Sequence, residues 1–425
     1  MKKLLALMLA LVMVLSLAAC GKGDGDTTEA SGDTVKIGVL LPLSGSTASP
    51  GGYQLEGIQL AVDYINDNGG IASMGGAKLE LVTSDTTGDV ETGMTEIERL
   101  ITVEKVSALI GPYNSTVGAA TSPIAIQYGV PYIITNAVAD NIMQNGANKY
   151  VYRVNYGASD MTPFRGMVVD YLGNLTEAGK FEKIAIIYDA GDWGTSENES
   201  FKEVAKEIGA EVVVSEAINT DSSDLSSVVN KIKSSGADVV FAGIFLNDAI
   251  LFTQQMKEYN CDVQIVGSGA GYADSKWLEA LGNTAENVMG TSDFNPSFGL
   301  TNDDAAALYE TYLEEHDNET MPLETSNGWC GMATLAMAIE AAGSADREDI
   351  ADAMYNLELD GDSLPLWFSM FEGVKFNTEG DELGRYNQNE LLGDTAGQIL
   401  KQVQNGEWQL VWPLENATAE IIFGK

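Results

Sequence analysis

Positive charge is scarce in this chain of 425 residues. Lysine and arginine together number 23, against 62 aspartates and glutamates, and the formal net charge is −39. So large an acidic excess argues against nucleic acid or an anionic lipid surface as a partner, because both carry the same sign of charge. A hydrophobic content of 45% in turn excludes a disordered acidic chain.

Histidine is nearly absent. His316 stands alone in the acidic stretch "YLEEHDNE", where we expect an exposed helix end. It has no predicted nucleophile beside it, and no serine or cysteine has the strand-to-helix setting of an activated one. The stretch "GPYNSTVG" (111–118) also lacks the lysine of a phosphate-binding loop. We therefore expect a protein that is not an enzyme, with no cofactor and no metal.

Cysteine is equally sparse. After Cys20 the chain has only Cys261 and Cys330, and two cysteines do not make a disulfide framework. A bridge between them and two buried free thiols both stay open. No stretch beyond the first twenty residues is long and apolar enough to cross a bilayer, so we expect the folded part in aqueous space.

The N-terminus is the one strongly apolar segment. "MKKLLALMLALVMVLSLAAC" has two lysines, an apolar stretch and small residues before a cysteine, as secretory signals do. Its end, "LAAC", resembles the bacterial lipobox, which implies a signal at 1–19 and a lipidated Cys20. Residues 20–33 are small and polar and predict a flexible tether. We expect anchoring at the outer face of the cytoplasmic membrane.

From residue 35 onward, short β-rich runs alternate with helical periods. The expected strands are 35–43, 77–85, 106–112, 131–136, 183–189, 211–218, 239–245, 264–269 and 371–380. The expected helices are 53–70, 90–104, 115–129, 200–209, 225–236, 248–259, 303–316 and 328–343. This order predicts an α/β fold with doubly wound parallel sheets, and about 400 residues suggest two domains.

Polar clusters follow the expected strands in both halves. In doubly wound sheets, ligands bind beyond the carboxyl ends of the strands, so these clusters predict a shared cleft. Ser115 and Thr116, after the Gly-Pro break at 111–112, stand where free helix-start N–H groups could hold an anion. Ordinary N-capping is the alternative. The other clusters are Ser44, Asn114, Asn136, 189–193, 245–248 and 268–272.

At this point the chain resembles the type I solute-binding proteins of the branched-chain amino-acid family, the extracytoplasmic receptors of ABC importers. The resemblance is carried by "IGVLLPLSG" (37–45), "EGIQLAVDYINDNGGI" (56–71), "ALIGPYNSTV" (108–117), "GVPYI" (129–133), "KIAIIYDAGDWG" (183–194) and "VKFNTEGD" (374–381). It implies two lobes joined by three crossings near 154–155, 290–291 and 377–381. Lobe 1 would then comprise 34–154 and 291–377, and lobe 2 would comprise 155–290 and 378–425.

Such receptors close like a clamp around a small solute, and the closed form meets the membrane permease. The implied partners are thus a small-molecule solute and ABC permease subunits, with the lipid anchor at Cys20, and we expect a monomer. A ligand-sensing module that reports to a membrane sensor is the alternative function. Neighbouring permease and ATPase genes, or a sensor-kinase gene, would distinguish the two.

The resemblance also implies site residues. Ser115 matches the position that receives the solute carboxylate, Asn136 and Ala137 the segment that offers backbone groups, and Trp193 an aromatic side chain that covers the ligand. The full expected set is Ser44, Asn114, Ser115, Thr116, Asn136, Ala137, Val138, Trp193, Phe245, Gly269 and Tyr272.

Two positions depart from the amino-acid-binding pattern. Val138 stands where a threonine hydroxyl is common, and Gly269 aligns with the acidic residue that neutralises the solute ammonium group. A buried ammonium without a carboxylate is costly, so leucine or valine as the ligand is open to question. A nearby carboxylate could substitute, and the candidates are Asp192, Asp248, Asp274 and Asp293. Otherwise the solute would be a carboxylate without an amine, or a neutral polar molecule.

Overall fold

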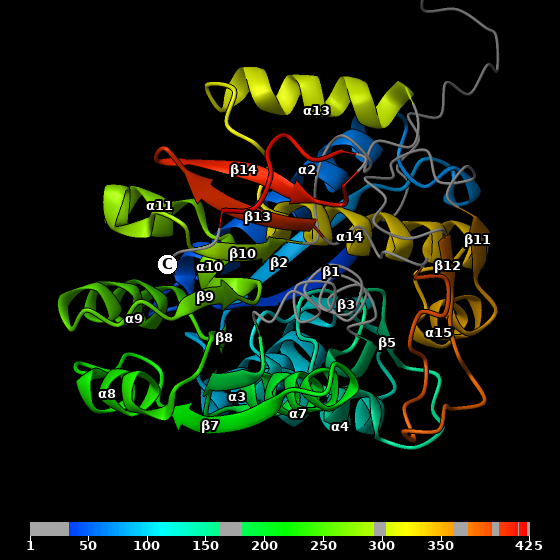
Figure 1. Ribbon diagram of the computed structural model, residues 1–425. Coiled ribbons are helices and arrows are strands. Elements are labelled where there is room, and N and C mark those ends of the chain that lie inside the picture. The colour runs from blue at the N-terminus through cyan, green and yellow to red at the C-terminus, as the bar shows by residue number, and fades with distance from the viewer. Residues whose placement is uncertain are drawn as a thin grey trace, which may run out of the picture.

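The computed structural model describes residues 34–160, 181–292, 303–360, 373–392, 399–414 and 416–422. The predicted signal, Cys20 and the tether lie outside these residues. Two α/β lobes are present, each built on its own parallel sheet (Figure 1). The predicted fold class is therefore confirmed.

The first sheet has five parallel strands in the order β2-β1-β3-β4-β5. They are β1 (Val35–Leu41), β2 (Leu79–Asp85), β3 (Ala108–Gly111), β4 (Tyr132–Ile134) and β5 (Val151–Arg153). The internal strand β1 reads "VKIGVLL" and is buried along nearly its whole length. A near-continuous apolar run suits a parallel strand, because helices cover both of its faces.

Helices from distant parts of the sequence cover this sheet. One face packs against α2 (Ala48–Asp67), α14 (Leu323–Ala342) and α15 (Arg347–Tyr355). The other face packs against α3 (Val90–Arg99) and α4 (Ser115–Tyr128). Helix α14 is buried on all sides and runs through the centre of the molecule (Figure 1). It begins at Leu323, far along the chain from α4, which ends at Tyr128.

Two glycines let α2 and α14 approach closely. A Cβ atom at Gly57 would lie 1.8 Å from the carbonyl oxygen of Thr325, and one at Gly328 would lie 2.3 Å from that of Gln54. Both distances are far inside van der Waals contact, so only glycine fits at either position. This pair sets the first two turns of α14 directly against α2.

The second sheet repeats the strand order of the first. Its parallel part runs β7-β6-β8-β9-β10, and β13 and β14 extend it as antiparallel strands. The strands are β6 (Lys183–Asp189), β7 (Glu211–Ile218), β8 (Val239–Gly243), β9 (Gln264–Gly267), β10 (Met289–Ser292), β13 (Ile399–Gln404) and β14 (Glu407–Trp412). The repeated order confirms the two similar halves expected from the sequence.

Helices cover both faces of this sheet as well. Helix α7 (Asp192–Glu207) packs on one face. On the other lie α8 (Ser226–Ser235), α9 (Leu246–Glu258) and α11 (Ser275–Leu281), and the short α10 (Ala270–Ala273) follows β9. Helix α13 (Asp303–Glu315) lies along the outside of the molecule, and the two-stranded sheet of β11 (Glu358–Asp360) and β12 (Gly373–Lys375) lies beside α15 (Figure 1).

Backbone pairing is observed near two of the three expected crossings. Thr291 and Ser292 belong to β10 in the second sheet. The segment after Asn377 folds back beside β5, where Asn389 N–H donates to the Arg153 carbonyl at 2.9 Å and Glu390 N–H donates to the Lys375 carbonyl at 2.8 Å. The lobe boundaries inferred from the sequence stay a prediction.

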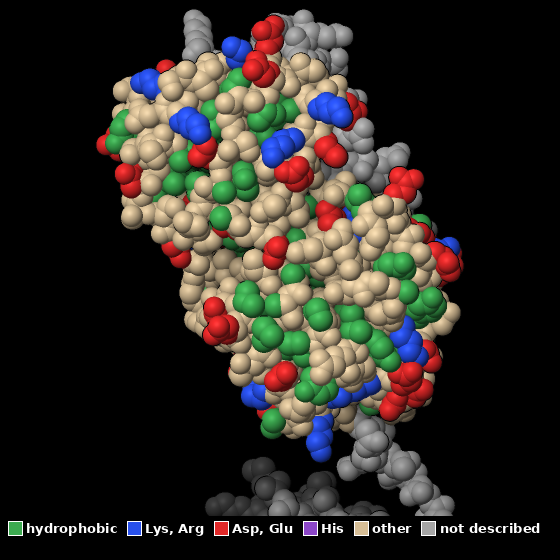
Figure 2. All heavy atoms as spheres, turned by 90° about the horizontal axis from the view of Figure 1, so that it is seen from below, with side chains coloured by type: hydrophobic (Ala, Val, Ile, Leu, Met, Phe, Trp, Pro, Cys, Tyr) green, Lys and Arg blue, Asp and Glu red, His purple; other side chains and the backbone are tan. Residues whose placement is uncertain are grey.

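Surface charge is spread widely. Figure 2 shows acidic and basic side chains interspersed over the face seen from below, and no broad basic area is visible among the described residues on that face. Within the described ranges, no helix has the length and apolarity to span a membrane.

Candidate functional site

The junction of β3 and α4 is built differently from a simple side-chain cap. Asn114 occupies the N-cap position without a side-chain capping bond, and Ser115 is the first helical residue. The Ser115 hydroxyl, which is buried, accepts a hydrogen bond from the N–H of Ala139 at 3.2 Å. Helix geometry leaves the N–H groups of Ser115, Thr116 and Val117 without intrahelical acceptors. The junction thus carries polarised donors at a positive helix end.

A cavity of about 60 Å³ lies between the two lobes at this junction. Its lobe 1 wall comprises Tyr113, Ser115, Asn136, Val138, Asn155, Tyr156, Leu323, Glu324 and Asn327. Its lobe 2 wall comprises Trp193, Glu197, Phe245, Ser268, Gly269 and Ala270. The cavity sits at the carboxyl ends of the strands of both sheets, where the doubly wound fold places ligands.

Glu197 is the carboxylate on the lobe 2 wall. It is 2% exposed, and the hydroxyl of Ser268 donates to its Oε2 at 2.6 Å. Glu197 follows Trp193 by four residues on α7, and side chains at that spacing share one helix face. The hydroxyl helps to fix the orientation of the carboxylate, and a carboxylate can accept several hydrogen bonds.

Glu324 is the carboxylate on the lobe 1 wall. It lies in the first turn of α14 and is 4% exposed, a position where the helix dipole stabilises negative charge. Burial, and next the charge of Glu324, hold the pKa of Tyr113 well above its usual value, so the phenol stays protonated. Burial lowers the pKa of Lys401 on β13 to about 8, while the charge of Glu324 favours its protonated form.

Aromatic rings divide this cavity from a second one. The rings of Trp193 and Phe245 lie 4.9 Å apart, and those of Tyr113 and Phe245 lie 6.2 Å apart. The neighbouring cavity, of about 410 Å³, shares Ser115, Trp193 and Phe245 with the first. Trp193 and Phe245 therefore stand where a solute would pass from one space to the other.

The second cavity has a polar and acidic lining. It includes Thr47, Asn114, Thr116, Asp189, Asp192, Thr220 and Asp221. Burial raises the pKa of Asp189, although bonds from the Thr220 hydroxyl and the Gly191 N–H partly oppose it. Asn141 Nδ2 of lobe 1 also donates to Asp192 Oδ1 of lobe 2 at 3.0 Å, which links the two lobes at the edge of the cleft.

Three residues of the sequence-derived set line neither cavity. The hydroxyl of Ser44 donates to Asp85 at 2.7 Å in an exposed loop. Ala137 is fully buried, and its carbonyl faces the Arg153 guanidinium at 3.4 Å. Tyr272 is fully buried, with its ring 5.2 Å from that of Trp277. We therefore do not propose these three side chains as ligand contacts.

The substitute carboxylates considered from the sequence have other roles in the fold. Asp248 accepts from the N–H groups of Asp221 and Ser222, and Asp274 is the N-cap of α11. Asp192 lines only the second cavity, and Asp293 lies outside the described residues. Sequence reasoning missed both Glu197 and Glu324. The signal that could have found Glu197 is its spacing of four residues from Trp193.

Gly269 has a backbone that disfavours the acidic residue expected there. Its φ is +38°, in the region that favours glycine, and its N–H donates to the Thr291 hydroxyl at 2.9 Å. The neighbouring Ser268 instead contacts Glu197. The carboxylate at this wall therefore comes from α7 and not from the loop after β9.

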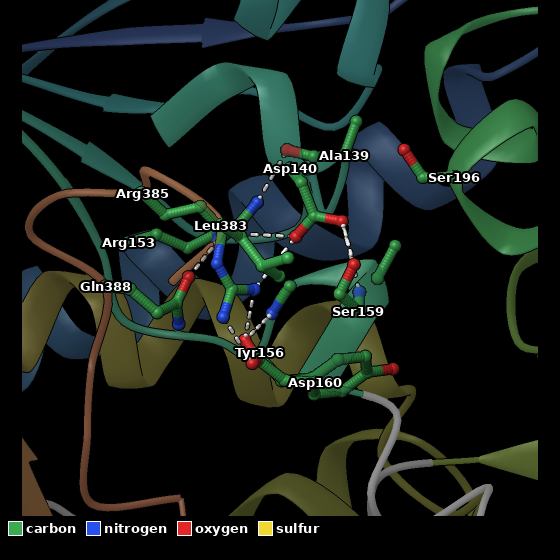
Figure 3. A network of polar contacts seen from close by, with 12 residues as sticks. Ala139, Asp140, Arg153, Tyr156, Ser159, Asp160, Ser196, Leu383, Arg385 and Gln388 are labelled. Atoms are coloured by element: carbon green, nitrogen blue, oxygen red, sulfur yellow. Dashed lines mark hydrogen bonds and ion pairs between the residues drawn. The ribbon is translucent and has the colours of Figure 1, made fainter. Parts of the chain in front are cut away.

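A buried ionic network supports the segment from 137 to 140 (Figure 3). Arg153 is fully buried and donates to the Ala139 carbonyl at 2.8 Å and to Gln388 at 2.6 Å. Arg385 donates to Asp140, to both oxygens of Asp160 and to Asp381, over 2.6 to 2.8 Å. Two chain segments near the expected crossings, 153–160 and 381–388, are thereby tied to the wall that holds Ser115 and Val138.

The single histidine and the two cysteines after Cys20 pack against other parts of the fold. His316 is half-buried rather than exposed, because its ring stacks on Tyr312 at 3.9 Å and its Nε2 lies 2.8 Å from Glu56. Cys261 and Cys330 are free and buried in separate clusters, which settles the question left open by the sequence. Among the described residues, no group of histidine, cysteine and carboxylate side chains could hold a metal ion.

Two doubly wound lobes with a buried polar cavity between them define a solute-binding protein of two-lobed type. Comparison with known families agrees: the chain belongs to the periplasmic binding protein family, whose sequence model matches residues 34–379. This is a family of solute-binding proteins and not of enzymes, as expected from the sequence.

Relatives of known name are similar over almost the whole chain. The Leu/Ile/Val-binding protein homolog 7 of Brucella suis is 30% identical over 419 residues, covering 96% of this chain and 98% of its own. Homolog 8 of Brucella abortus is 30% identical over 402 residues, covering 92% and 93%.

Solved structures share the fold at lower identity. The leucine-binding protein LivK of Thermotoga maritima has a TM-score of 0.73 at 22% identity, covering 89% of this chain and 97% of its own. LivJ of Streptococcus pneumoniae, in complex with isoleucine, has a TM-score of 0.72 at 23% identity, covering 88% and 98%. A solute-binding protein of R. palustris, in complex with benzoate, has a TM-score of 0.71 at 21% identity, covering 89% and 95%.

Proposed function

We propose that this protein is the extracytoplasmic receptor of an ABC importer and that it captures a small α-amino acid by closing its two lobes around it. The observation that carries this proposal is the pairing of charges across the cavity. The free N–H groups and hydroxyl at Ser115 suit a carboxylate, and the Glu197 carboxylate on the opposite wall suits an ammonium group.

The aromatic side chains of Trp193 and Phe245 would cover the ligand with apolar area and π faces. Val138 adds an apolar contact in place of a hydroxyl. The relatives support an amino acid as the solute, because two are named as Leu/Ile/Val-binding homologues and LivJ is in complex with isoleucine. The benzoate complex is the contrasting case, since benzoate has a carboxylate and no amine.

Titration calorimetry with the twenty L-amino acids, and with benzoate as the amine-free comparison, tests this function. At least one amino acid should bind, stabilise the protein by mass action and reduce its radius of gyration in solution scattering. Binding of benzoate with no binding of any amino acid would overturn the proposal. Binding without compaction would overturn the closing step alone.

Lipid anchoring is a separate part of the proposal. "LAAC" at 17–20 supports a lipidated Cys20, which would hold the receptor beside its permease. Cys20→Ala should move the protein from the membrane fraction to the soluble extracytoplasmic fraction. Unchanged membrane association of that variant would contradict the anchor and leave solute capture unaffected.

A further inference from the structure

Two polar atoms in the cavity have no partner within the described residues. They are Asn136 Oδ1 and Asn327 Nδ2, and both are buried. Asn327 as a whole is 1% exposed and lies on α14, three residues after Glu324, so the two side chains share one helix face. Both asparagines line the cavity between the lobes.

An unpaired buried polar atom destabilises a folded protein unless something satisfies it. Asn327 Nδ2 requires an acceptor and Asn136 Oδ1 requires a donor. Glu324, on the same helix face as Asn327, adds a carboxylate with several acceptor sites. The α14 side of the cavity is therefore suited to a ligand group that both donates and accepts hydrogen bonds.

Charge distinguishes a neutral group from a cation at this place. The cavity lining contains two carboxylates and no lysine or arginine. Glu197 lies on the lobe 2 wall, across the cavity from Ser115, and is the carboxylate that the proposed function assigns to the solute ammonium. Glu324, on the lobe 1 wall beside Asn327, is therefore assigned to a neutral donor.

We propose that Glu324, Asn327 and Asn136 form a side-chain subsite for a carboxamide, and that the solute is an amide-bearing amino acid. This inference rests on the proposed function. The amide NH₂ donates to Glu324 and Asn136, and the amide carbonyl accepts from Asn327 Nδ2.

Other side chains leave this subsite incomplete. An aliphatic chain satisfies none of the three groups, and an ammonium group leaves Asn327 Nδ2 without an acceptor. A carboxylate would stand against Glu324 with the same charge. A site built to hydrogen-bond a substrate group rejects analogues that lack that group more strongly than an apolar pocket rejects a missing methylene.

Calorimetry with six probes tests the subsite: L-asparagine, L-glutamine, L-glutamate, L-norleucine, L-leucine and L-lysine. The tighter of the two amides should bind at least about 10-fold more tightly than the other four. Asn327→Leu should reduce this preference by about 10-fold, mainly by weakening amide binding. Glu324→Gln, the second variant, should also reduce the preference for the amide.

Ser326→Ala is the matched control, because Ser326 is the buried neighbour on α14 whose hydroxyl also has no partner in the described part and which does not line the cavity. It should leave the preference unchanged. Tighter binding of leucine, norleucine or lysine than of either amide would overturn the inference and leave the proposed function standing. An unchanged preference in folded Asn327→Leu and Glu324→Gln would also overturn it. Failure of every amino acid to bind would overturn both.

Discussion

Glu197 lies one helical turn after Trp193 on α7, and the two side chains line the same cavity. A single helix thus delivers both the aromatic ring that we propose covers the solute and the carboxylate that we propose receives its amine. Ser268, from the loop after β9, contacts that carboxylate. Lobe 2 therefore builds this wall at the ends of β6 and β9, two strands that β8 separates in the sheet.

Glu197→Gln should weaken the binding of the amino acid found in the calorimetric screen. Loss of the charge-assisted bond predicts about 1.5–3 kcal/mol, or about 10- to 150-fold in affinity. Glu203→Gln is the matched control, because Glu203 is exposed on the same helix. Equal affinities of the two variants would show that Glu197 does not receive the ammonium group.

Ser115→Ala separates ligand binding from stability. The variant loses the acceptor for the Ala139 N–H, so we expect a loss of about 0.5–1.5 kcal/mol in the free energy of unfolding. Affinity should fall by about 10- to 150-fold, as one charge-assisted bond to the solute is lost. Ser122→Ala removes a buried hydroxyl from the same helix that bonds only to Gly118, and it should keep full affinity. Reduced stability with full affinity in Ser115→Ala would assign the hydroxyl a structural role only.

His316 should make the stability of the protein depend on pH. Partial burial acts to lower the pKa of His316, but the contacts with the Tyr312 carbonyl and Glu56 outweigh it, and the pKa is raised. A raised folded-state pKa means that the protonated ring stabilises the fold fully below its unfolded value of about 6.5. That contribution is lost as the pH rises through the folded-state value.

The measurement is the free energy of chemical unfolding between pH 5 and pH 9 for the wild type and His316→Gln. The wild-type advantage should be largest at the acidic end and should shrink toward the alkaline end. Glu56→Gln, which removes the partner carboxylate, should reduce the same difference. An advantage that grows with pH would contradict the pairing.

Gly57→Ala should destabilise the protein by about 1–3 kcal/mol or more, because the added methyl meets the Thr325 carbonyl. Gly52→Ala, in the same helix and with open space around the new methyl, should instead stabilise by about 0.5–1 kcal/mol. Thermal and chemical unfolding of the two variants give the comparison. Equal effects would mean that α2 and α14 do not cross as closely as described.

The alternation of strands and helices could be predicted from the sequence, because hydrophobic residues recur with a different period in buried strands and in amphipathic helices. Strands at 183–189 and 211–218 match β6 and β7 at both ends. Helix starts were less readable: α7 was expected at 200 and begins at Asp192, and α14 was expected at 328 and begins at Leu323.

That error in helix starts explains the two carboxylates that were missed. Glu197 and Glu324 both lie in the early turns that were assigned to loops. The polar character of those turns hid the helical period, and the two side chains stand out only in the fold, where Glu197 bonds to Ser268 from a distant segment and both carboxylates line one cavity. Contacts of that kind cannot be read from local spacing.

The central position of α14 determines when lobe 1 can become complete during synthesis. Strands β1 to β5 end at Arg153, yet α14, which packs beside α2 on one face of their sheet, begins only at Leu323. About half of the chain must therefore be synthesised between β5 and the end of α14 before that apolar face is fully covered. The parallel strands of lobe 2 and the helices that cover them all lie between Lys183 and Ser292. The parallel core of lobe 2 can therefore form from one continuous segment of the chain.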